Sequence, residues 1–585
     1  MTRPYDLLVK NVRVVRPNQS SVESLDVGIK DGKFARLSRG IRPEDANETI
    51  DANNLLGFPG CVDAHMHIGI YRDLAQDAVS ESKAAAMGGT TTSLTYFRTG
   101  QYYLNRGGPY RQFMPEVLRL SEGNYWVDYG YHLAPIEAGH IDEMESLLTD
   151  WGVPSFKIFM FYGGYGLHGR SSSQNEFLMI GPEERYDVAH FEFIMRSARR
   201  LMLARPEIAE HISVSLHCEL AEILTAYTKI VEREGRLDGL AAYSAARPPH
   251  AEGLAIWIAS YLAYETECLN INLLHLSSKK AIDAALMMQK IFPHIHFRRE
   301  VTVGHLLLDT DCSCGVLAKV NPPIRPRADV EALWEAVLER KVDWIVSDHA
   351  CCATEQKYSA QFPKNIWLAR SGFGGTEYLL SGVLSEGRKR GMGYNHIAEV
   401  LSWNPAQRYG LLAKGDIAPG FDADLVLVDP DESFVVRAAD SESAQGYTPF
   451  EGQELTGRVK TTFLRGRPVY RVSFEPKRHQ EFDEAAWRGE ALIDRDEYQP
   501  VLVTTHLAFK IPLLVKTLLG TDIKGLGFAV AYQKFEDGVW FPVSYGGEFE
   551  VRAVFFYKRT ISISLVNSDF KRTSVNSYVT YHMEQ

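Results

Sequence analysis

The sequence has few cysteines, no long apolar run and no excess of positive charge. Only 7 of its 585 residues are cysteine, and their spacing matches neither a disulfide framework nor a zinc ribbon. No stretch of about 18 apolar residues is present, and the N-terminus lacks a basic segment followed by an apolar core. The formal net charge of -11 argues against a nucleic-acid surface. We therefore expect a cytoplasmic protein with reduced cysteines and with neither a membrane nor a nucleic-acid partner.

The chain is too long for one hydrophobic core, and its pattern changes along its length. Residues 1–57 and 411–470 carry short alternating strands with turns between them, such as Lys30-Asp31-Gly32-Lys33. We expect these two flanks to form one composite β-sandwich domain. Residues 58–410 alternate buried-type strands with helical segments, which indicates a parallel sheet covered by helices.

Eight strand candidates occur in the central region, which is the number expected of a TIM (β/α)8 barrel. They are residues 60–68, 89–97, 127–136, 155–162, 212–219, 270–277, 297–306 and 343–349. The predicted fold class is therefore α/β, a TIM barrel with a small β-sandwich built from both of its flanks.

The last part of the chain differs from both regions. Residues 471–497 are charged with a weak helical pattern, so we expect a linker. Residues 498–585 are expected to form a β-rich C-terminal appendage that begins with an amphipathic helix. The expected elements are the helix at 502–519 and strands at 527–534, 539–545, 548–558, 560–566 and 574–582. A lid, an oligomer contact and a fused module all remain open as roles for this appendage.

Two histidines end the first barrel strand, His65 and His67. Side chains alternate along a strand, so both imidazoles point to the same side and can bind one divalent metal ion. A pair of this kind alone is weak support, because many such pairs are only solvated or hydrogen-bonded. The rest of the chain must supply the other ligands.

Polar side chains of the ligand type also end other strands, at the face where TIM barrels carry their chemistry. A single histidine at a strand end is more often a satisfied core residue than a ligand, but several strand ends together favour a metal site. A carboxylate among them can bind metal and also move a proton. The strand-end candidates are His217, His275 and Asp348, with His349 as a neighbour only, and Lys157 lies inside a further strand.

Lys157 lies in the middle of an apolar strand, Ser155-Phe-Lys-Ile-Phe-Met. Burying an ammonium group is costly unless it is paired or neutralised. The alternative interpretation is a lysine whose stem is buried while its charged end reaches solvent. Residue pattern alone does not decide between a functional and a surface-reaching lysine.

Taken together, these segments resemble the cyclic amidohydrolases, which include dihydropyrimidinase, hydantoinase, allantoinase and dihydroorotase. The resemblance covers about residues 5–470. The segments that carry it are Pro59-Gly-Cys-Val-Asp-Ala-His-Met-His, Lys157-Ile-Phe-Met, His217-Cys-Glu, Arg247-Pro-Pro with Glu252, His275-Leu-Ser-Ser, Lys319-Val-Asn-Pro-Pro-Ile-Arg, Ser347-Asp-His, Asn404-Pro-Ala and Gly420-Phe-Asp-Ala-Asp-Leu-Val.

The resemblance implies a centre of two divalent metal ions, with zinc as the expected metal. The implied ligands are His65, His67 and Asp348 for one ion, and His217 and His275 for the other. Lys157, converted by carbon dioxide to N6-carboxylysine, would bridge the two ions, so that no isolated cation stays buried. Asp348 would carry the proton from the attacking hydroxide to the leaving nitrogen. The reaction would open the ring of a small cyclic amide.

Three further residues are implied as substrate contacts. Tyr162, five residues after Lys157, corresponds to a tyrosine that donates a hydrogen bond to the developing oxyanion. The alternative for Tyr162 is an ordinary aromatic at a strand end. Asn321 and Ser371 occupy positions whose backbone groups would hold the ring amide.

The sequence also departs from the family pattern. Dihydroorotase and allantoinase usually continue as His-x-His-x-Arg, where the arginine binds a charged group of the substrate, but Gly69 stands at that position. Arg72, three residues further on, is a candidate substitute. Hydantoinases usually carry serine and asparagine where this chain has Asn321 and Ser371. The subfamily is therefore left open.

The sequence predicts a metal-dependent hydrolase that opens a carbon–nitrogen bond in a cyclic ureide or imide of the dihydropyrimidine or hydantoin type. Allantoinase and dihydroorotase are the alternatives within the same enzyme class. An alternative from another class is a non-catalytic scaffold related to dihydropyrimidinase, which the complete set of candidate ligands disfavours. The resemblance also implies a homodimer or a homotetramer.

Overall fold

The structure is a computed structural model that describes residues 3–163, 173–358, 361, 363–468 and seven strands between residues 472 and 566. The chain divides into two compact units, Met1–Val469 and Tyr470–Gln585. Among the described helices, none is long and apolar enough to cross a membrane.

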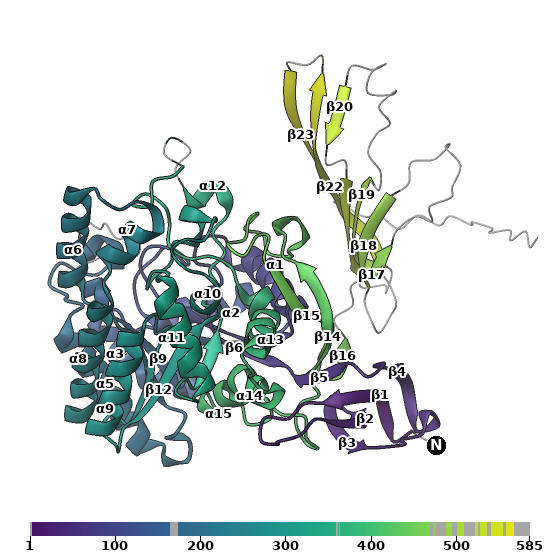
Figure 1. Cartoon of the computed structure of the whole chain (residues 1–585), viewed down its shortest axis with the longest axis horizontal. Coiled ribbons are helices and arrows are strands. Elements are labelled where there is room, and N and C mark those ends of the chain that lie inside the picture. Colours follow the sequence, from purple (N-terminus) through teal and green to yellow (C-terminus); the bar gives the residue numbers. More distant parts are fainter. Residues whose placement is uncertain are drawn as a thin grey trace, which may run out of the picture. The chain divides into compact units, whose positions relative to one another are not determined.

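The first unit is organised around an eight-stranded parallel sheet closed into a TIM barrel (Figure 1). Its strands follow the chain order: β6 (Cys61–Met66), β7 (Thr90–Phe97), β8 (Asp128–Leu133), β9 (Ser155–Phe159), β10 (Ser213–His217), β11 (Asn270–Leu273), β12 (His296–Thr302) and β13 (Trp344–Val346). A bridge between Met66 and His349 closes the ring, and the His67 N–H donates to the His349 carbonyl at 2.7 Å. The predicted fold class is confirmed. Most strands end two to four residues earlier than expected, because the chain turns into loops that carry the polar side chains.

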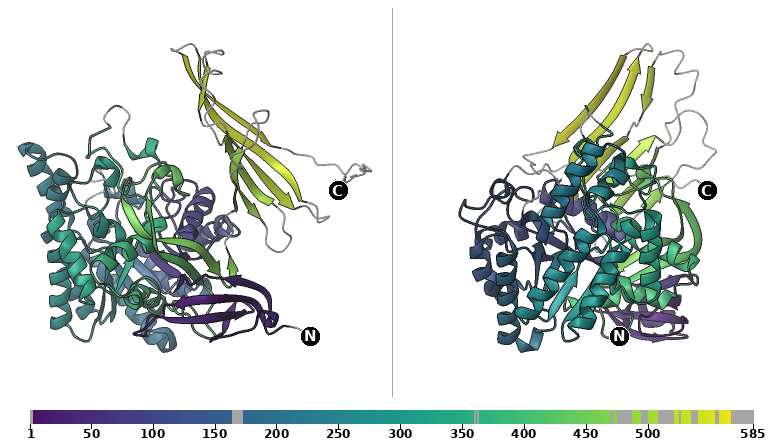
Figure 2. Two further views of the ribbon diagram at one scale, coloured as in Figure 1. Left: turned by 45° about the vertical axis from the view of Figure 1, so that its right-hand side comes forward. Right: turned by 60° about the vertical axis from the view of Figure 1, so that its left-hand side comes forward.

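Helices surround the barrel on its outer side (Figure 2). Several begin at a side-chain cap: Asp73 accepts from two backbone N–H groups of α1, and Asp187 does the same for α5. The helices are α1 (Leu74–Met87), α2 (Tyr110–Ser121), α3 (Ala138–Trp151), α4 (Gln174–Leu178), α5 (Val188–Ala204), α6 (Ala221–Glu234), α7 (Gly239–Ala246), α8 (Pro249–Glu265), α9 (Lys279–Ile291), α10 (Val303–Leu307), α11 (Arg327–Leu338), α12 (Thr354–Lys357), α13 (Leu379–Lys389), α14 (Tyr394–Ala398) and α15 (Asn404–Arg408).

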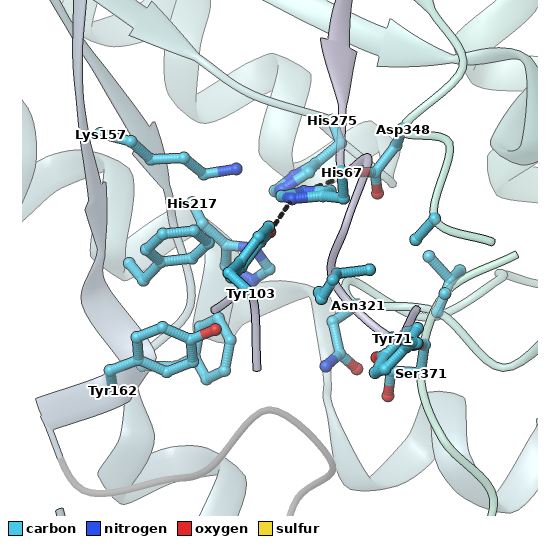
Figure 3. A pocket seen from close by; sticks show the side chains of 16 residues that line it. His67, Tyr71, Tyr103, Lys157, Tyr162, His217, His275, Asn321, Asp348 and Ser371 are labelled. Carbon is cyan, nitrogen blue, oxygen red and sulfur yellow. Dashed lines mark hydrogen bonds and ion pairs between the residues drawn. The ribbon is translucent and has the colours of Figure 1, made fainter. Parts of the chain in front are cut away.

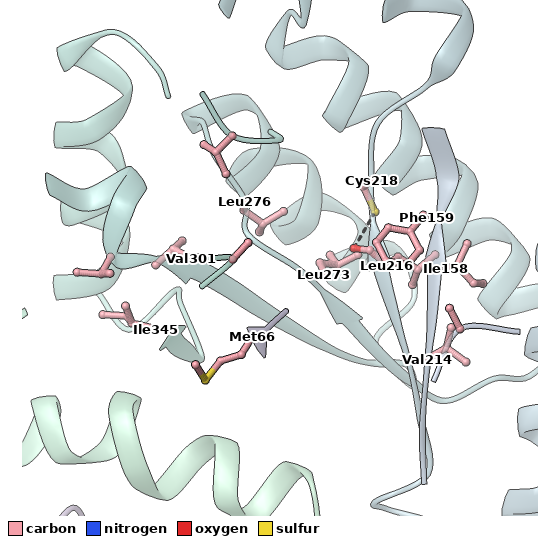
Figure 4. Packing of buried hydrophobic residues seen from close by; sticks show 14 of the residues in the cluster. Met66, Ile158, Phe159, Val214, Leu216, Cys218, Leu273, Leu276, Val301 and Ile345 are labelled. Carbon is pink, nitrogen blue, oxygen red and sulfur yellow. Dashed lines mark hydrogen bonds between the residues drawn. The ribbon is translucent and has the colours of Figure 1, made fainter. Parts of the chain in front are cut away.

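The strands separate apolar from polar side chains by alternation. Met66, Leu273, Val301 and Ile345 belong to the large core cluster and pack among the buried apolar side chains of Figure 4. Their immediate neighbours in the strands include polar residues of the barrel interior, such as His65, which is fully buried. Period-two alternation thus supplies both the packed core and the inward-facing polar side chains.

Both flanks of the barrel contribute to one further eight-stranded sheet, as the predicted fold class requires. Its order is β16-β15-β14-β5-β1-β2-β3, with β4 paired to β1. The turn between β2 and β3 places Asp31 at φ 50° and Gly32 at φ 73°, as a tight hairpin turn needs. The strands are β1 (Tyr5–Val14), β2 (Glu23–Lys30), β3 (Lys33–Ser38), β4 (Ala46–Asp51), β5 (Leu56–Pro59), β14 (Leu425–Val435), β15 (Glu454–Leu464) and β16 (Arg467–Pro468).

The second unit contains an antiparallel sheet of seven strands. They are β17 (Val472–Phe474), β18 (Trp487–Ile493), β19 (Pro500–Leu507), β20 (Thr521–Lys524), β21 (Gly527–Lys534), β22 (Trp540–Ala553) and β23 (Tyr557–Val566). The β-rich C-terminal appendage is therefore confirmed. The expected strand at 574–582 lies outside the described residues.

Three expectations for this unit are wrong. Strands β17 and β18 lie inside the predicted linker 471–497 and pair with each other in antiparallel register. Strand β19 occupies the start of the predicted helix 502–519, where its pairing with β18 and β21 outweighs an amphipathic helical pattern, and residues 508–519 lie outside the described residues. Strand β22 runs without interruption through the predicted break at Gly546 and Gly547.

The expectation of reduced cysteines is also wrong for one pair. Cys312 and Cys314 form a disulfide across a short turn, which sequence spacing does not reveal. The other five cysteines are free and buried.

Candidate active site

All six predicted ligands meet over the carboxyl end of the barrel, and Figure 3 labels all of them except His65. Each is at most 9% exposed. Strand β6 supplies His65, and the residue after its end supplies His67; β9 carries Lys157 and β10 ends at His217. The turns after β11 and β13 carry His275 and Asp348, both at positive φ (35° and 53°). Such backbone conformations concentrate at functional sites.

The first cluster contains two imidazoles and one carboxylate. The Asp348 Oδ1 atom lies 3.2 Å from His65 Nε2 and 3.3 Å from His67 Nε2. One ligand-type atom from each of the three residues lies within 4.8 Å of the others. A set of nitrogen and carboxylate donors at this spacing fits a divalent cation such as Zn²⁺.

Lys157 reaches the same cluster from β9. Its Nζ lies 2.9 Å from His65 Nε2 and 4.1 Å from the centre of the Tyr96 ring. The side chain does not reach solvent, so the surface-reaching interpretation is wrong. Burial lowers the pKa of the Lys157 amine to about 7, although the charges of Asp348 and Glu300 act in the opposite direction.

His217 and His275 form the second cluster, with ring centres 4.3 Å apart. Burial lowers the pKa of His217 to about 4, which favours the neutral imidazole that binds metal. His217 Nε2 lies 2.6 Å from Glu219, so Nδ1 is the nitrogen left for a ligand. His275 Nδ1 is buried and has no hydrogen-bond partner among the described residues. A bound cation would satisfy a nitrogen of this kind, so the donor set fits two ions.

Carboxylates outside the ligand set hold two of the histidines. Glu300, on β12, lies 2.7 Å from His65 Nδ1 and also accepts from the Trp344 indole N–H at 2.8 Å. Glu219 is paired with His217 and accepts hydrogen bonds from two nitrogens of the Arg247 guanidinium, Nε and one terminal nitrogen. Such partners orient metal-binding imidazoles and set their tautomers.

The predicted substrate contacts line the same pocket. Tyr162 follows β9 in a short 3-10 turn, Met160–Gly163, and stacks on Phe159 with ring centres 4.7 Å apart. Asn321 Oδ1 accepts from the Tyr243 hydroxyl at 2.5 Å, and the Ser371 carbonyl accepts from Tyr71 at 2.6 Å. The structure thus places all three residues beside the ligands, while their roles stay predictions.

A sequence model of the amidohydrolase family matches residues 201–469. Allantoinase from Escherichia coli O1:K1 is 30% identical over 480 residues, which cover 80% of this chain and 96% of that protein. The chain belongs to the amidohydrolase family. The predicted resemblance and the predicted hydrolase class are confirmed.

Solved structures support the same assignment. The L-hydantoinase (dihydropyrimidinase) from Arthrobacter aurescens matches with a TM-score of 0.68 and 26% identity, over 80% of this chain and 96% of that chain. A dihydropyrimidinase from Brevibacillus agri matches with a TM-score of 0.67 at 24% identity, over 79% of this chain and 94% of that chain, and supports the fold alone. One fifth of this amidohydrolase lies outside the match to the L-hydantoinase.

This amidohydrolase departs from the family pattern at Gly69 for a structural reason. Gly69 has φ +81°, and a Cβ there would lie 2.8 Å from the Leu74 side chain. The candidate substitute, Arg72, donates to Asp77 and Ser80 at 3.2 and 3.0 Å and is not among the residues that line the described pocket. The turn before α1 thus requires the positive φ of Gly69 and pairs Arg72 with residues of α1.

Sequence patterns missed three residues around the site. Glu300 follows Arg298 and Arg299 in β12, and this charged run gives no sign in the sequence that Glu300 alone is fully buried. Tyr103 lines the pocket from the loop between β7 and α2, and Arg98, in the same loop, packs over the rings of Tyr103 and Tyr162. Arg98 directly follows the end of β7, whereas Tyr103 lies five residues further into the loop, whose path decides where it lies.

Proposed function

We propose that this amidohydrolase opens the amide bond of a cyclic ureide or imide of the dihydropyrimidine or hydantoin type, using two divalent metal ions. The observation that carries the proposal is that three buried histidines, Lys157 and Asp348 line one pocket, with buried His65 at 3.2 Å from Asp348 and 2.9 Å from Lys157. Relatives named L-hydantoinase (dihydropyrimidinase) and allantoinase support a substrate of this chemical class.

The proposed ligands form two groups. The first group contains His65, His67 and Asp348, and the second contains His217 and His275. When bound, two such cations polarise a carbonyl group and lower the pKa of a water molecule toward neutrality.

Lys157 is proposed to act as a carbamate. Its neutral amine attacks the carbon of carbon dioxide, a C–N bond forms, and one proton leaves to solvent, so the buried side chain becomes an anionic oxygen donor. Its Nζ already lies 2.9 Å from His65, within reach of the first ligand group. Carbamylation also replaces a buried cation, which is costly, with a group that suits a cationic site.

Asp348 is proposed to transfer a proton, and Tyr162 is proposed to stabilise the developing negative charge. Asp348 Oδ1 faces both His65 and His67 and can take the proton of the attacking water and pass it to the leaving nitrogen. Tyr162 lines the pocket and can donate its O–H to the oxygen that becomes negative. Burial raises the pKa of Tyr162, so the hydroxyl keeps its proton, although nearby Arg98 acts in the opposite direction.

Reconstitution of metal-free enzyme with Zn²⁺ and bicarbonate should depend on pH through Lys157. Because the pKa of Lys157 is lowered to about 7, its reactive neutral fraction rises with pH and levels off just above neutrality. At a fixed concentration of dissolved carbon dioxide, the neutral fraction for such a pKa, and hence the reactivation rate, grows roughly tenfold between pH 6 and pH 8. Recovered activity measured against time at each pH, then assayed at one common pH, gives the profile. A midpoint near that of an ordinary lysine would contradict the lowered pKa.

Allantoin hydrolysis is the second candidate, favoured by the 30% identity to allantoinase over 480 residues. Dihydrouracil, a 5-substituted hydantoin, allantoin and dihydroorotate, assayed at matched concentrations, distinguish the candidates. We expect turnover of the first two to exceed that of dihydroorotate, because Gly69 offers no arginine for its carboxylate. Preference for allantoin would establish the second candidate, and no turnover of any ring by zinc-loaded protein would contradict the proposal.

Metal analysis of the same preparation distinguishes an enzyme from a non-catalytic scaffold. The enzyme should bind two ions per chain, whereas a scaffold would bind none.

We also propose a homodimer or homotetramer, supported by exposed apolar residues on α5 and α8, such as Phe193 (54% exposed) and Tyr261 (56%). Light scattering of the full chain gives its mass in solution.

A further inference from the structure

Tyr103 contacts the candidate metal site but has no role in the proposed mechanism. Its hydroxyl lies 2.6 Å from His67 Nδ1, as the dashed line in Figure 3 shows. The side chain is 5% exposed and lines the same pocket as the ligand histidines. A buried phenol at this distance makes a hydrogen bond with the imidazole.

The surrounding structure holds Tyr103 in place. Its ring lies 4.6 Å from the ring of Phe97, and the guanidinium of Arg98 packs 5.6 Å from its centre. Tyr103 and its neighbour Tyr102 have φ +46° and +65°. Left-handed backbone at bulky residues costs on the order of 1–3 kcal/mol each and persists only where surrounding contacts enforce it. Such strain at a pocket residue indicates that the position of its side chain matters.

The three ligand histidines with identified partners are held differently. Carboxylates hold His65 and His217, whereas the neutral phenol of Tyr103 is paired with His67. The Tyr96 backbone carbonyl also faces the His67 ring. An imidazole that binds a cation through Nε2 must carry its proton on Nδ1, and this proton needs an acceptor.

We propose that Tyr103 is a positioning residue that accepts the Nδ1–H of His67 and so keeps Nε2 unprotonated and directed at the ion position that His67 shares with Asp348. The His67 ring is then ordered before a metal ion arrives. This inference rests on the proposed function. The loop between β7 and α2 would therefore affect the affinity of one of the two ion sites, because Tyr103 contacts His67 and not the His217–His275 pair.

The test is Tyr103→Phe in the full-length chain, loaded with Zn²⁺ or Co²⁺. Competition with a chelator should show one of the two ions bound about 10–100-fold more weakly, with the other unchanged. The absorption of the weakened Co²⁺ site should shift. With excess metal, kcat should recover more than it does with one equivalent, while KM stays near the wild-type value.

Tyr110→Phe is the matched control. Tyr110 is fully buried, and its hydroxyl donates to the Ala134 carbonyl at 2.7 Å outside the pocket. This variant loses a buried tyrosine hydrogen bond too, so its Tm should fall while both ions keep wild-type affinity. Wild-type affinity for both ions in Tyr103→Phe, or equal metal loss in the two variants, would overturn the inference. Failure of the wild-type chain to bind metal would instead overturn the proposed function itself.

Discussion

Lys157→Ala is expected to abolish ring opening while the chain stays folded. Lewis-acid stabilisation by bound metal is worth several kcal/mol, and each 1.36 kcal/mol is tenfold in rate, so kcat/KM should fall by on the order of 10³-fold or more. The side chain is 1% exposed, and its Nζ contacts His65 rather than a carboxylate partner. Removing it therefore removes the proposed bridge and not a structural ion pair. Elemental analysis should show fewer than two ions per chain, with an unchanged circular dichroism spectrum.

Rescue of Lys157→Ala by added carboxylates distinguishes a carbamate on Lys157 from other roles of this residue. Alanine leaves a cavity beside His65 that acetate or propionate can enter, supplying the missing anionic oxygens. Part of the activity and metal content should return with increasing carboxylate. Lys157→Met is the control, because it fills the same space without a donor and should not be rescued. Retained two-ion binding in either variant would argue against Lys157 as the bridge.

Arg247→Met is expected to destabilise the first unit strongly. The Arg247 and Glu219 side chains are 1% and 0% exposed, and Arg247 Nε donates to Glu219 Oε1 at 3.0 Å. Burial alone raises the pKa of Glu219, but the charge of Arg247 and the hydrogen bond with His217 bring it down to about 2. Without Arg247 a buried carboxylate loses its counter-charge, at a cost of about 3–5 kcal/mol. Tm and urea midpoint should both fall, and metal affinity should fall with them, because Glu219 orients His217.

An exposed ion pair provides the comparison. Lys279 and Asp283 are 64% and 54% exposed at 2.7 Å, so Lys279→Met should change stability by no more than about 0.5 kcal/mol. Glu219→Gln combined with Arg247→Met removes the uncompensated charge and should recover part of the stability, though not the metal affinity. Equal stability of Arg247→Met and Lys279→Met would show that the buried pair contributes little.

The site residues that the sequence predicts follow from rules that apply within a single strand. Alternation along a strand put His65 and His67 on one side, and the strand ends of a TIM barrel gathered Lys157, His217 and Asp348. In the C-terminal sheet the same rules failed, because strand β19 lies between β18 and β21 and pairs with both. Pairing partners, and not the pattern of one segment, decided that structure.

Interactions between distant residues had to come from the tertiary structure. Glu300 lies 235 residues from His65, and Tyr103 reaches His67 only because its loop adopts a left-handed turn. The turn before α1 likewise decides that Arg72 binds Asp77.

The sequence by itself therefore determined the barrel and the identity of the candidate ligands, since both follow from periodicity and strand order. Only the tertiary structure decided that the Lys157 amine is buried, which nitrogen of His217 is free, and that Tyr103 holds His67. These facts depend on burial and on contacts across the barrel, which no local pattern of residues contains.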